Sequence, residues 1–523
     1  MKRSPWLGAL LVVLLAVMAV APLTYPGFFE SQSGFLPSFR LQHLSPASVV
    51  DRVDPVRSEG GLAYWLAWPF LKLSGRGVIA VKWGYGLSFV FGALAVYGWA
   101  RRWLGSEGGA LAAVVYTYLP WHLATVYLRG AYAEAWLWVL WPALLLAWEA
   151  RLRRGTALVR LAGVALGVAA LLVQPGLSFF FLVFLVPYAV AVWRVRWWAA
   201  RVVAVVLAMG LLVFGAWVAA SVAGGQAAAA PAGLLYPFQL LSAAWDQGLS
   251  GDGLPYQLGV VAVGLSIAAL ALWAARAKQT GAPEDPGDEH ASLLSLSPAL
   301  TFWLVALLVI LFLTLRPSAP LWRALHLGSL VTHPWQPLAL AGLPLAFLAG
   351  SVTRLDRRLA ERPVWAGLAA LAILASYAYL APHFTRVDPG AQPVAEFQPA
   401  GAVVPPIQML VAGVSPATGI TSTVTLTLTW QALATVPEDY TVFVHLLAAG
   451  TKLAQSDARP CGGECPTSGW RPGAIVVDRH PIVLPPNAPP GPYRLAVGLY
   501  LLATGERVPV VGRDDGTVYL DVR

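Results

Sequence analysis

The sequence predicts a polytopic α-helical membrane protein with a C-terminal antiparallel β-sandwich, and three observations carry this prediction. Hydrophobic residues make up 58% of the chain and charged residues only 12%, which is far from the balance of soluble globular proteins. Long apolar runs alternate with short basic clusters up to about residue 380. Beyond that point apolar and polar residues alternate one by one, as they do in half-buried strands.

The apolar runs predict about eleven membrane spans. These begin near positions 6, 78, 109, 132, 156, 177, 202, 259, 292, 336 and 364. The first run, 6–22, follows Lys2 and Arg3 and reads either as a signal peptide or as a retained helix. We expect a retained helix, because no small-x-small cleavage site follows and the run is close to the ~20 residues that cross a hydrocarbon core.

The basic clusters predict how the spans are oriented in the cell membrane. If the N-terminus is cytoplasmic, every second connection carries a cluster such as Arg101–Arg102, as the positive-inside rule requires. The outer loop 24–77, the connections 129–132, 221–258 and 316–336, and the C-terminal domain then lie on the extracytoplasmic side. The formal charge of +9 resides in these clusters and forms no basic stripe, so we expect the lipid bilayer, and no nucleic acid, as a partner.

Changes in sequence character predict three parts of the chain. They are a transmembrane domain, 1–382, a proline-rich linker, 383–405, and an extracytoplasmic β-sandwich, 406–523. The segment "TVTLTLTW", 423–430, alternates threonine with apolar residues at the period of a half-buried strand. The segments that start at Tyr440 and Tyr493 are apolar on both faces and indicate central strands, and the turn signals between strands favour a sandwich.

The chain has two cysteines, Cys461 and Cys465, both on the proposed outer side. We expect a disulfide that closes this small loop, because disulfides persist outside the cytoplasm. Two unpaired surface thiols are the alternative. A zinc site has less support, since no second pair of cysteine or histidine residues has ligand spacing.

Familiar catalytic motifs are missing from the sequence. It contains no Walker A loop, no G-x-G-x-x-G after a strand, no H-E-x-x-H and no G-x-S-x-G. Any chemistry is therefore expected at the outer membrane face, from acidic and aromatic residues of the outer connections. These candidates are Glu30, Asp51, Asp54, Glu59, Glu134, Asp246, Asp252, Trp245, Tyr256, His333 and Trp335.

The segment Tyr127–Trp136 places two charges, Arg129 and Glu134, between two apolar runs. Gly130 allows the chain to reverse there, so both charges are expected at the outer interface. Two interpretations remain open: an interfacial ion pair with a snorkelling arginine, or a functional site.

Four segments together resemble the bacterial membrane proteins labelled 6-pyruvoyl-tetrahydropterin synthase-related. They are "YTYLPWH", "YLRGAYAEA", "WDQGLSGDGLPYQLG" and "HPWQPLALAGLPLAFLAG". Proteins of this family look like glycosyltransferases of the GT-C class. The resemblance, which covers most of 1–380, therefore implies a polyprenyl-phosphate-linked sugar donor, an envelope glycan or lipid acceptor, and an acidic base in an outer loop. Pterin chemistry has no support, because it would need a soluble zinc-histidine site.

The tail is similar to a β-sandwich appended to glycosyltransferase-39-like proteins. The likeness rests on six segments in order: "LTWQAL", "DYTVFVHLL", "AQSDARP", "PTSGWRPGAIVVDRH", "PPGPYRLAVGLY" and "TGERVPV". This match covers nearly the whole domain and says little about activity.

The first outer loop departs from the family pattern E-S-H-D-G, in which the aspartate is the favoured catalytic position. This chain has Glu30 and Ser31 followed by Gln32 and Ser33. A serine cannot accept a proton as a carboxylate does. Either Glu30, Asp51, Asp54 or Glu59 takes over the role of base, or the fold has lost its reaction. Two further departures are Gln336 in place of an arginine and Gln174 in place of a histidine.

The resemblance assigns expected roles to individual residues. Glu134 is expected to orient the acceptor or hold a metal ion, with Asp54 or Glu30 as the base. The phosphate leaving group would need Arg129, Arg40, Arg57 or a divalent metal ion, although contact with lipid headgroups is favoured for Arg40 and Arg57. The residues expected to contact substrate are Arg129, Trp245, Asp246, His333 and Trp335.

Three hypotheses of function follow. The first is a glycosyltransferase, and the second is a catalytically inactive protein that uses the same helices to bind a lipid-linked glycan or polysaccharide. A transporter is the third, and the sequence shows no internal repeat that would support it.

Overall fold

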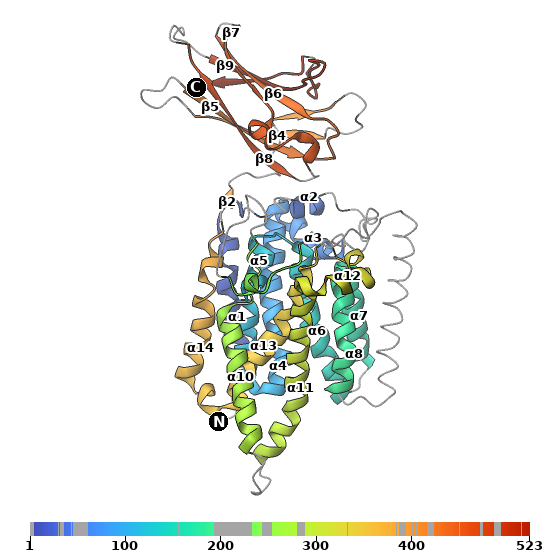
Figure 1. Cartoon of the computed structure of the whole chain (residues 1–523). Helices are drawn as coiled ribbons and strands as arrows, with labels where there is room; N and C mark the ends of the chain where they lie inside the picture. Colours follow the sequence, from blue (N-terminus) through green and yellow to red (C-terminus); the bar gives the residue numbers. More distant parts are fainter. Residues whose placement is uncertain are drawn as a thin grey trace.

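A computed structural model of the chain describes most of its residues. The described residues are 5–29, 31, 36–42, 44, 61–154, 157–192, 233–242, 254–279, 288–331, 333–382, 384–385, 394–399, 402, 406–415, 423–448, 450–470, 474–485, 493–513 and 515–522. The structure is a bundle of helices with a two-sheet region of strands beyond one end (Figure 1). The helix α1 begins at the opposite end of the bundle, and the chain ends among the strands (Figure 1).

The helices of the bundle differ widely in length, from one turn or two to a long kinked element. They are α1 Pro5–Val20, α2 Leu36–Gln42, α3 Leu62–Ser74, α4 Gly77–Thr117, α5 Pro120–Tyr127, α6 Tyr132–Arg154, α7 Ala157–Val173, α8 Pro175–Ala191, α10 Val260–Gln279, α11 Asp288–Thr314, α12 Ala319–Ala324, α13 Gly342–Leu355 and α14 Arg362–Leu374.

Five helical stretches in the described part of the chain are long and apolar enough to cross a membrane. They are Trp6–Thr24, Gly77–Thr117, Val260–Ala277, Leu296–Thr314 and Gln336–Leu355. Shorter apolar helices lie at Leu161–Val173, Pro175–Val190 and Arg362–Leu374. Large apolar side chains such as Leu14, Val260 and Leu308 are exposed on these helices, as a lipid-facing surface requires. The span expected to begin near 202 lies outside the described residues.

The helix α4 is a hairpin that reverses at Gly105. The backbone there has φ 79°, a value that favours glycine. Beyond the reversal, a Cβ on Gly109 would lie 2.7 Å from the backbone nitrogen of Arg101. The Tyr97 and Ser106 hydroxyl oxygens are 3.1 Å apart across the turn. The two arms of the hairpin overlap the apolar runs that begin near 78 and 109.

The helix α13 forms the centre of the bundle. All of its residues except Arg354 are buried, as expected for a helix that is apolar on all sides. It packs closely against the second arm of α4, where a Cβ on Gly350 would lie 2.5 Å from the carbonyl oxygen of Gly108. Small residues at this crossing let the two backbones approach each other.

A short strand pair brings together two segments from the beginning and the end of the helical part of the sequence. In this pair β1, Phe28–Phe29, lies antiparallel to β2, Phe384–Thr385, with Phe28 opposite Thr385. The pair joins the chain after α1 to the chain after α14, on the side of the bundle that faces the strands (Figure 1).

The C-terminal part consists of two four-stranded antiparallel sheets with a shared apolar core. One sheet has the order β3-β4-β5-β8 and the other β10-β9-β6-β7. Their bounds are β3 Ala395–Phe397, β4 Ile407–Ser415, β5 Thr423–Ala432, β6 Tyr440–Ala448, β7 Thr451–Ala458, β8 Ile475–Val483, β9 Tyr493–Leu501 and β10 Val518–Val522. The alternation predicted for β5 is confirmed, because Leu426, Leu428 and Trp430 are fully buried.

Part of the segment expected as a linker, 383–405, belongs to this core. The strand β3 pairs with β4 through Phe397 opposite Ile407, and both side chains are fully buried. The sequence did not indicate β3 for two reasons. Prolines lie near it, and three residues are too few to show the alternation of a strand.

The crossing of α4 and α13 generates a stability prediction. We expect Gly350→Ala to lower the thermal midpoint of the protein in detergent, with a cost of about 1–3 kcal/mol, because the new methyl group would collide with backbone. The matched control is Gly367→Ala in α14, where a Cβ would meet nothing within 4 Å. An equal shift of the thermal midpoint in the two variants would contradict the close packing at Gly350.

Candidate functional site

A buried ion pair occupies the turn between α5 and α6. The Arg129 guanidinium donates from Nη1 to Glu134 Oε1 at 2.6 Å and from Nη2 to Oε2 at 2.7 Å. Only 7% of the Arg129 side chain and 1% of the Glu134 side chain are exposed. A bidentate pair is the geometry that lets two charges remain this far from water.

Local sequence explains why the pair forms at this position. The helix α5 ends at Tyr127, and Gly130 has φ 62°, which confirms the expected chain reversal. The helix α6 begins at Tyr132 and places Glu134 in its first turn, where the helix dipole favours a negative charge. Arg129 and Glu134 therefore meet across a tight turn.

Aromatic rings enclose the guanidinium of Arg129. Its Cζ lies 5.2 Å from the centroid of the Trp121 ring and 4.7 Å from that of the Trp335 ring. Tyr256 stacks on Trp121 with centroids 5.6 Å apart and lies 5.7 Å from Trp335. The interpretation with a snorkelling arginine is therefore not supported, because cation–π contacts and Glu134 hold Arg129 inside the protein.

Residues from three connections that are expected on one side of the membrane form this enclosure. Arg129, Tyr256 and Trp335 come from the connections 129–132, 221–258 and 316–336. His333 stacks on Trp335, with ring centroids 4.8 Å apart, and is the exposed member of the group. We call Trp121, Arg129, Glu134, Tyr256, His333 and Trp335 the arginine cluster.

The arginine cluster lies in the half of the bundle nearer the strands. The helix α5 is in that half (Figure 1). The Tyr127 hydroxyl donates to the carbonyl oxygen of Ala19 at 2.5 Å, in the last turn of α1. The structure thus brings together five of the predicted site residues: Arg129, Glu134, Tyr256, His333 and Trp335.

Most of the other predicted site residues cannot be placed, because they lie outside the described part of the chain. Glu30, Asp54, Trp245 and Asp246 lie outside the described residues, as do Gln32, Ser33, Asp51, Arg57, Glu59 and Asp252. Arg40 is half-buried on α2, and Gln174 is buried at the start of α8.

The cluster is a poor match to a metal site. No group of three metal-ligating His, Cys, Asp or Glu side chains occurs among the residues that the structure describes. A metal ion at Glu134 would also compete with the guanidinium, which bonds both carboxylate oxygens. The arrangement suits binding of an anion or a polar ring, because the ion pair uses only two of the five guanidinium N–H donors.

Sequence reasoning missed a second buried carboxylate, Glu149, which is only 5% exposed. Its Oε1 accepts hydrogen bonds from Trp99 Nε1 at 2.9 Å, Trp103 Nε1 at 2.8 Å and the Tyr188 hydroxyl at 2.8 Å. Glu149 lies fifteen residues after Glu134 on α6, which is about 22 Å along the helix. No local signal could have found it, because its partners Trp99 and Trp103 are 50 and 46 residues away along the chain.

His122 of α5 was also missed. Its ring stacks on Trp138 with centroids 4.1 Å apart and planes 1° apart. Nδ1 lies 3.0 Å from the carbonyl oxygen of Tyr116, so Nδ1 carries the proton and Nε2 keeps a lone pair. Within the described part of the chain, that buried Nε2 has no hydrogen-bond partner.

The strand region has a separate buried polar network around its disulfide. Cys461 and Cys465 are bonded, with Cα atoms 5.4 Å apart. The backbone N–H of Cys461 donates to Asp478 Oδ1 at 2.9 Å, and Asp478 Oδ2 lies 2.7 Å from His480 Nε2. The disulfide loop is thereby anchored to β8.

No protein-family model matches the chain, and no curated protein sequence matches it.

The ion pair generates a second prediction. We expect Glu134→Gln to destabilise the folded protein in detergent by about 3 kcal/mol, because Arg129 would remain buried without its counter-charge. The matched control is Glu361→Gln at an exposed position, which should change the thermal midpoint little. Similar midpoints for the two variants would show that the pair contributes nothing to stability.

Glu149 generates a third prediction. Glu149→Leu removes the acceptor of three buried donors, whereas Glu149→Gln keeps an oxygen at the same position. We therefore expect the leucine variant to be less stable than the glutamine variant by about 2 kcal/mol or more in thermal unfolding. The opposite order would contradict the acceptor role, because the donors of Trp99, Trp103 and Tyr188 would then not need an oxygen at this position.

Proposed function

We propose that this chain is a GT-C-like membrane glycosyltransferase. It moves a sugar from a polyprenyl-phosphate-linked donor to a cell-envelope glycan or lipid at the outer face of the cell membrane. In this proposal the chain has about eleven spans, a cytoplasmic N-terminus and an extracytoplasmic sandwich. The resemblance of four segments to the GT-C-like family supports it, and two of these segments, 116–122 and 127–135, supply Trp121, Arg129 and Glu134.

The observation that carries the proposal is the arginine cluster. A single guanidinium, held by a carboxylate and covered by indole rings, lies in the half of the bundle nearer the sandwich. A planar guanidinium is well suited to bind phosphate, and an aromatic ring can stack on a sugar ring. Exposed His333 marks the side from which a substrate would reach the cluster.

The proposed reaction needs a base and a stabilised leaving group. An acceptor hydroxyl attacks the anomeric carbon, the bond from that carbon to the phosphate oxygen breaks, and the hydroxyl proton passes to a carboxylate. Arg129 would stabilise the charge on the departing phosphate. Because both oxygens of Glu134 bond Arg129, Glu134 acts as a positioning residue, and the base is left to Asp54 or Glu30.

A binding protein without catalysis is the second candidate. Gln32 and Ser33 replace the family's histidine and aspartate, and Glu134 is occupied by Arg129. The Trp335 ring also packs against protein groups on several sides, which suits a rigid binding surface as well as a reactive one.

Transfer assays separate the two candidates. Membranes that contain the wild type, Arg129→Lys or Glu361→Gln would be supplied with radiolabelled polyprenyl-phosphate sugars, and labelled products would be counted. We expect transfer by the wild type and the Glu361→Gln control, and a loss of at least about tenfold in Arg129→Lys, since lysine cannot form the bidentate geometry. Size-exclusion profiles would establish that each variant is folded.

Absence of transfer from folded wild type with every donor would contradict the enzyme. Retention of the same labelled donors on the purified protein, with weaker retention by Arg129→Lys, would then support the binding protein.

A further inference from the structure

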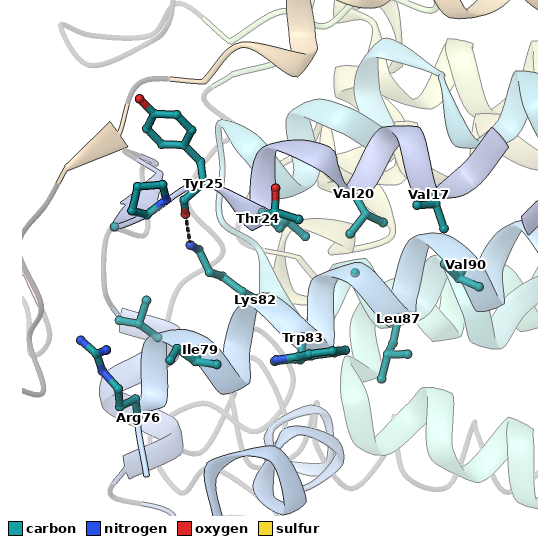
Figure 2. A pocket seen from close by; sticks show the side chains of 15 residues that line it. Val17, Val20, Thr24, Tyr25, Arg76, Ile79, Lys82, Trp83, Leu87 and Val90 are labelled. Carbon is teal, nitrogen blue, oxygen red and sulfur yellow. Dashed lines mark hydrogen bonds between the residues drawn. The ribbon is translucent and has the colours of Figure 1, made fainter. Parts of the chain in front are cut away.

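Two hollows in the helical bundle differ in how their polar groups are used. The larger is a groove of about 690 Å³ between the end of α1 and the beginning of α4, where the Lys82 ammonium donates to the carbonyl oxygen of Tyr25 at 2.6 Å (Figure 2). The smaller has a volume of about 270 Å³ and contains a buried donor with no such acceptor among the described residues. We call this smaller hollow, which Gln257, Val260 and Ala375 help to line, the α10–α14 pocket.

The α10–α14 pocket lies where several helices of the bundle begin or end. Pro120 begins α5, Gly259 directly precedes α10, and Ala375 directly follows α14. A Cβ on Gly259 would lie 2.8 Å from Pro120 Cδ, so α10 begins close against α5. The Ser376 hydroxyl donates to the carbonyl oxygen of Tyr118 at 2.6 Å, which ties the end of α14 to the end of α4. The pocket is therefore framed by fixed helix ends.

The mouth of the pocket opens on the outside of the bundle. Its lining residues Val260, Ala375 and Ala378 are exposed, Val260 to 71%. The stretch Val260–Ala277 is one of those long and apolar enough to cross a membrane, so the pocket lies at the end of a candidate span. At that level a bilayer passes from its hydrocarbon core to its headgroup region. A membrane lipid has access to the pocket from this side.

Gln257 supplies the buried donor of the pocket. Its side chain is only 5% exposed, and within the described part of the chain its Nε2 has no hydrogen-bond partner. The Tyr379 phenol lies near this amide. Because Nε2 carries two N–H groups, a donor would remain even with a bond to that phenol. A buried donor without an acceptor is costly, and a ligand oxygen would recover that cost.

The walls of the pocket carry no charge. All of its lining residues lie in the described part of the chain, and none of them is Asp, Glu, Lys, Arg or His. Most of them are alanine, valine, leucine, glycine or proline. A phosphate, carboxylate or ammonium group would be buried there without a counter-charge. An uncharged acceptor oxygen on an apolar chain suits both the amide and the walls.

We propose that the α10–α14 pocket binds the acyl ester of a membrane glycerolipid. The ester carbonyl oxygen accepts a hydrogen bond from Gln257 Nε2, the first part of the acyl chain lies against the apolar walls, and the headgroup stays outside the mouth. A volume of about 270 Å³ is just below that of pockets that enclose a whole ligand, so it suits part of a lipid. The inference does not depend on sugar transfer, because it uses no residue of the arginine cluster.

Other occupants fit the pocket less well. A water molecule needs two to four polar partners, and walls that are mostly apolar do not supply them to a group of waters. A hydrocarbon without oxygen would leave Gln257 Nε2 unbonded, and an ionised fatty acid would bring a charge into uncharged walls. The ester linkage is an uncharged acceptor that the bilayer presents at the level of the mouth.

The test compares two phosphatidylcholines that differ only in how their chains are linked. Full-length protein in detergent would be incubated with equal amounts of an ester-linked dioleoyl lipid and its ether-linked dioleyl analogue, and bound lipid would be identified by native mass spectrometry. We expect the wild type to retain the ester lipid about fivefold more, which is the effect of one hydrogen bond to a buried donor. In Gln257→Leu the ratio should fall to about one. Equal retention by the wild type, or an unchanged ratio in Gln257→Leu, would overturn the proposal.

Tryptophan variants locate the bound lipid. Ala375→Trp fills the pocket and should remove the preference for the ester lipid, whereas Ala366→Trp, at an exposed position of α14 outside the pocket, should behave like the wild type. Leu87→Trp fills the larger groove between α1 and α4 and should leave the ratio unchanged. Size exclusion would establish that each variant is folded. Loss of the preference in Ala366→Trp or in Leu87→Trp would contradict binding in the α10–α14 pocket.

Discussion

The bidentate ion pair between Arg129 and Glu134 is the interaction on which one end of the helical bundle depends. Two charges this deeply buried are stable only while each has the other. The pair fixes the turn from α5 to α6, and the guanidinium then draws Trp121 and Trp335 against it. Trp121 and Trp335, which are about two hundred residues apart in the chain, meet at the side chain of Arg129.

The packing of α4 against α13 does not depend on charged side chains. The arms of α4 and the central helix α13 contain almost no charge where they cross, and glycines let their backbones approach. Dispersion and shape hold these helices together, since burying apolar surface gains little when lipid is the alternative surroundings. The buried carboxylates of α6, Glu134 and Glu149, are exceptions near its two ends, and each is surrounded by donors. This distribution keeps polar groups away from the middle of α6.

Sequence patterns predicted features that depend on neighbours in the chain. The reversal at Gly130 and the alternation in 423–430 follow from local geometry or period. The burial of Arg129 did not follow, because Trp335 covers it from a distant segment. Glu149 was missed for the same reason, since its partners Trp99 and Tyr188 are 50 and 39 residues away. The burial of Arg129 and Glu149 is therefore determined by contacts in the folded protein and not by residue spacing in the sequence.

A double-mutant cycle on Arg129 and Glu134 tests this account most directly. The single variants Arg129→Met and Glu134→Met and the double variant would be unfolded in one detergent, and the coupling free energy calculated. The account predicts a double variant more stable than either single variant, with coupling of about 2 kcal/mol or more. Additive effects within about 0.5 kcal/mol would contradict it, because the two side chains would then contribute independently.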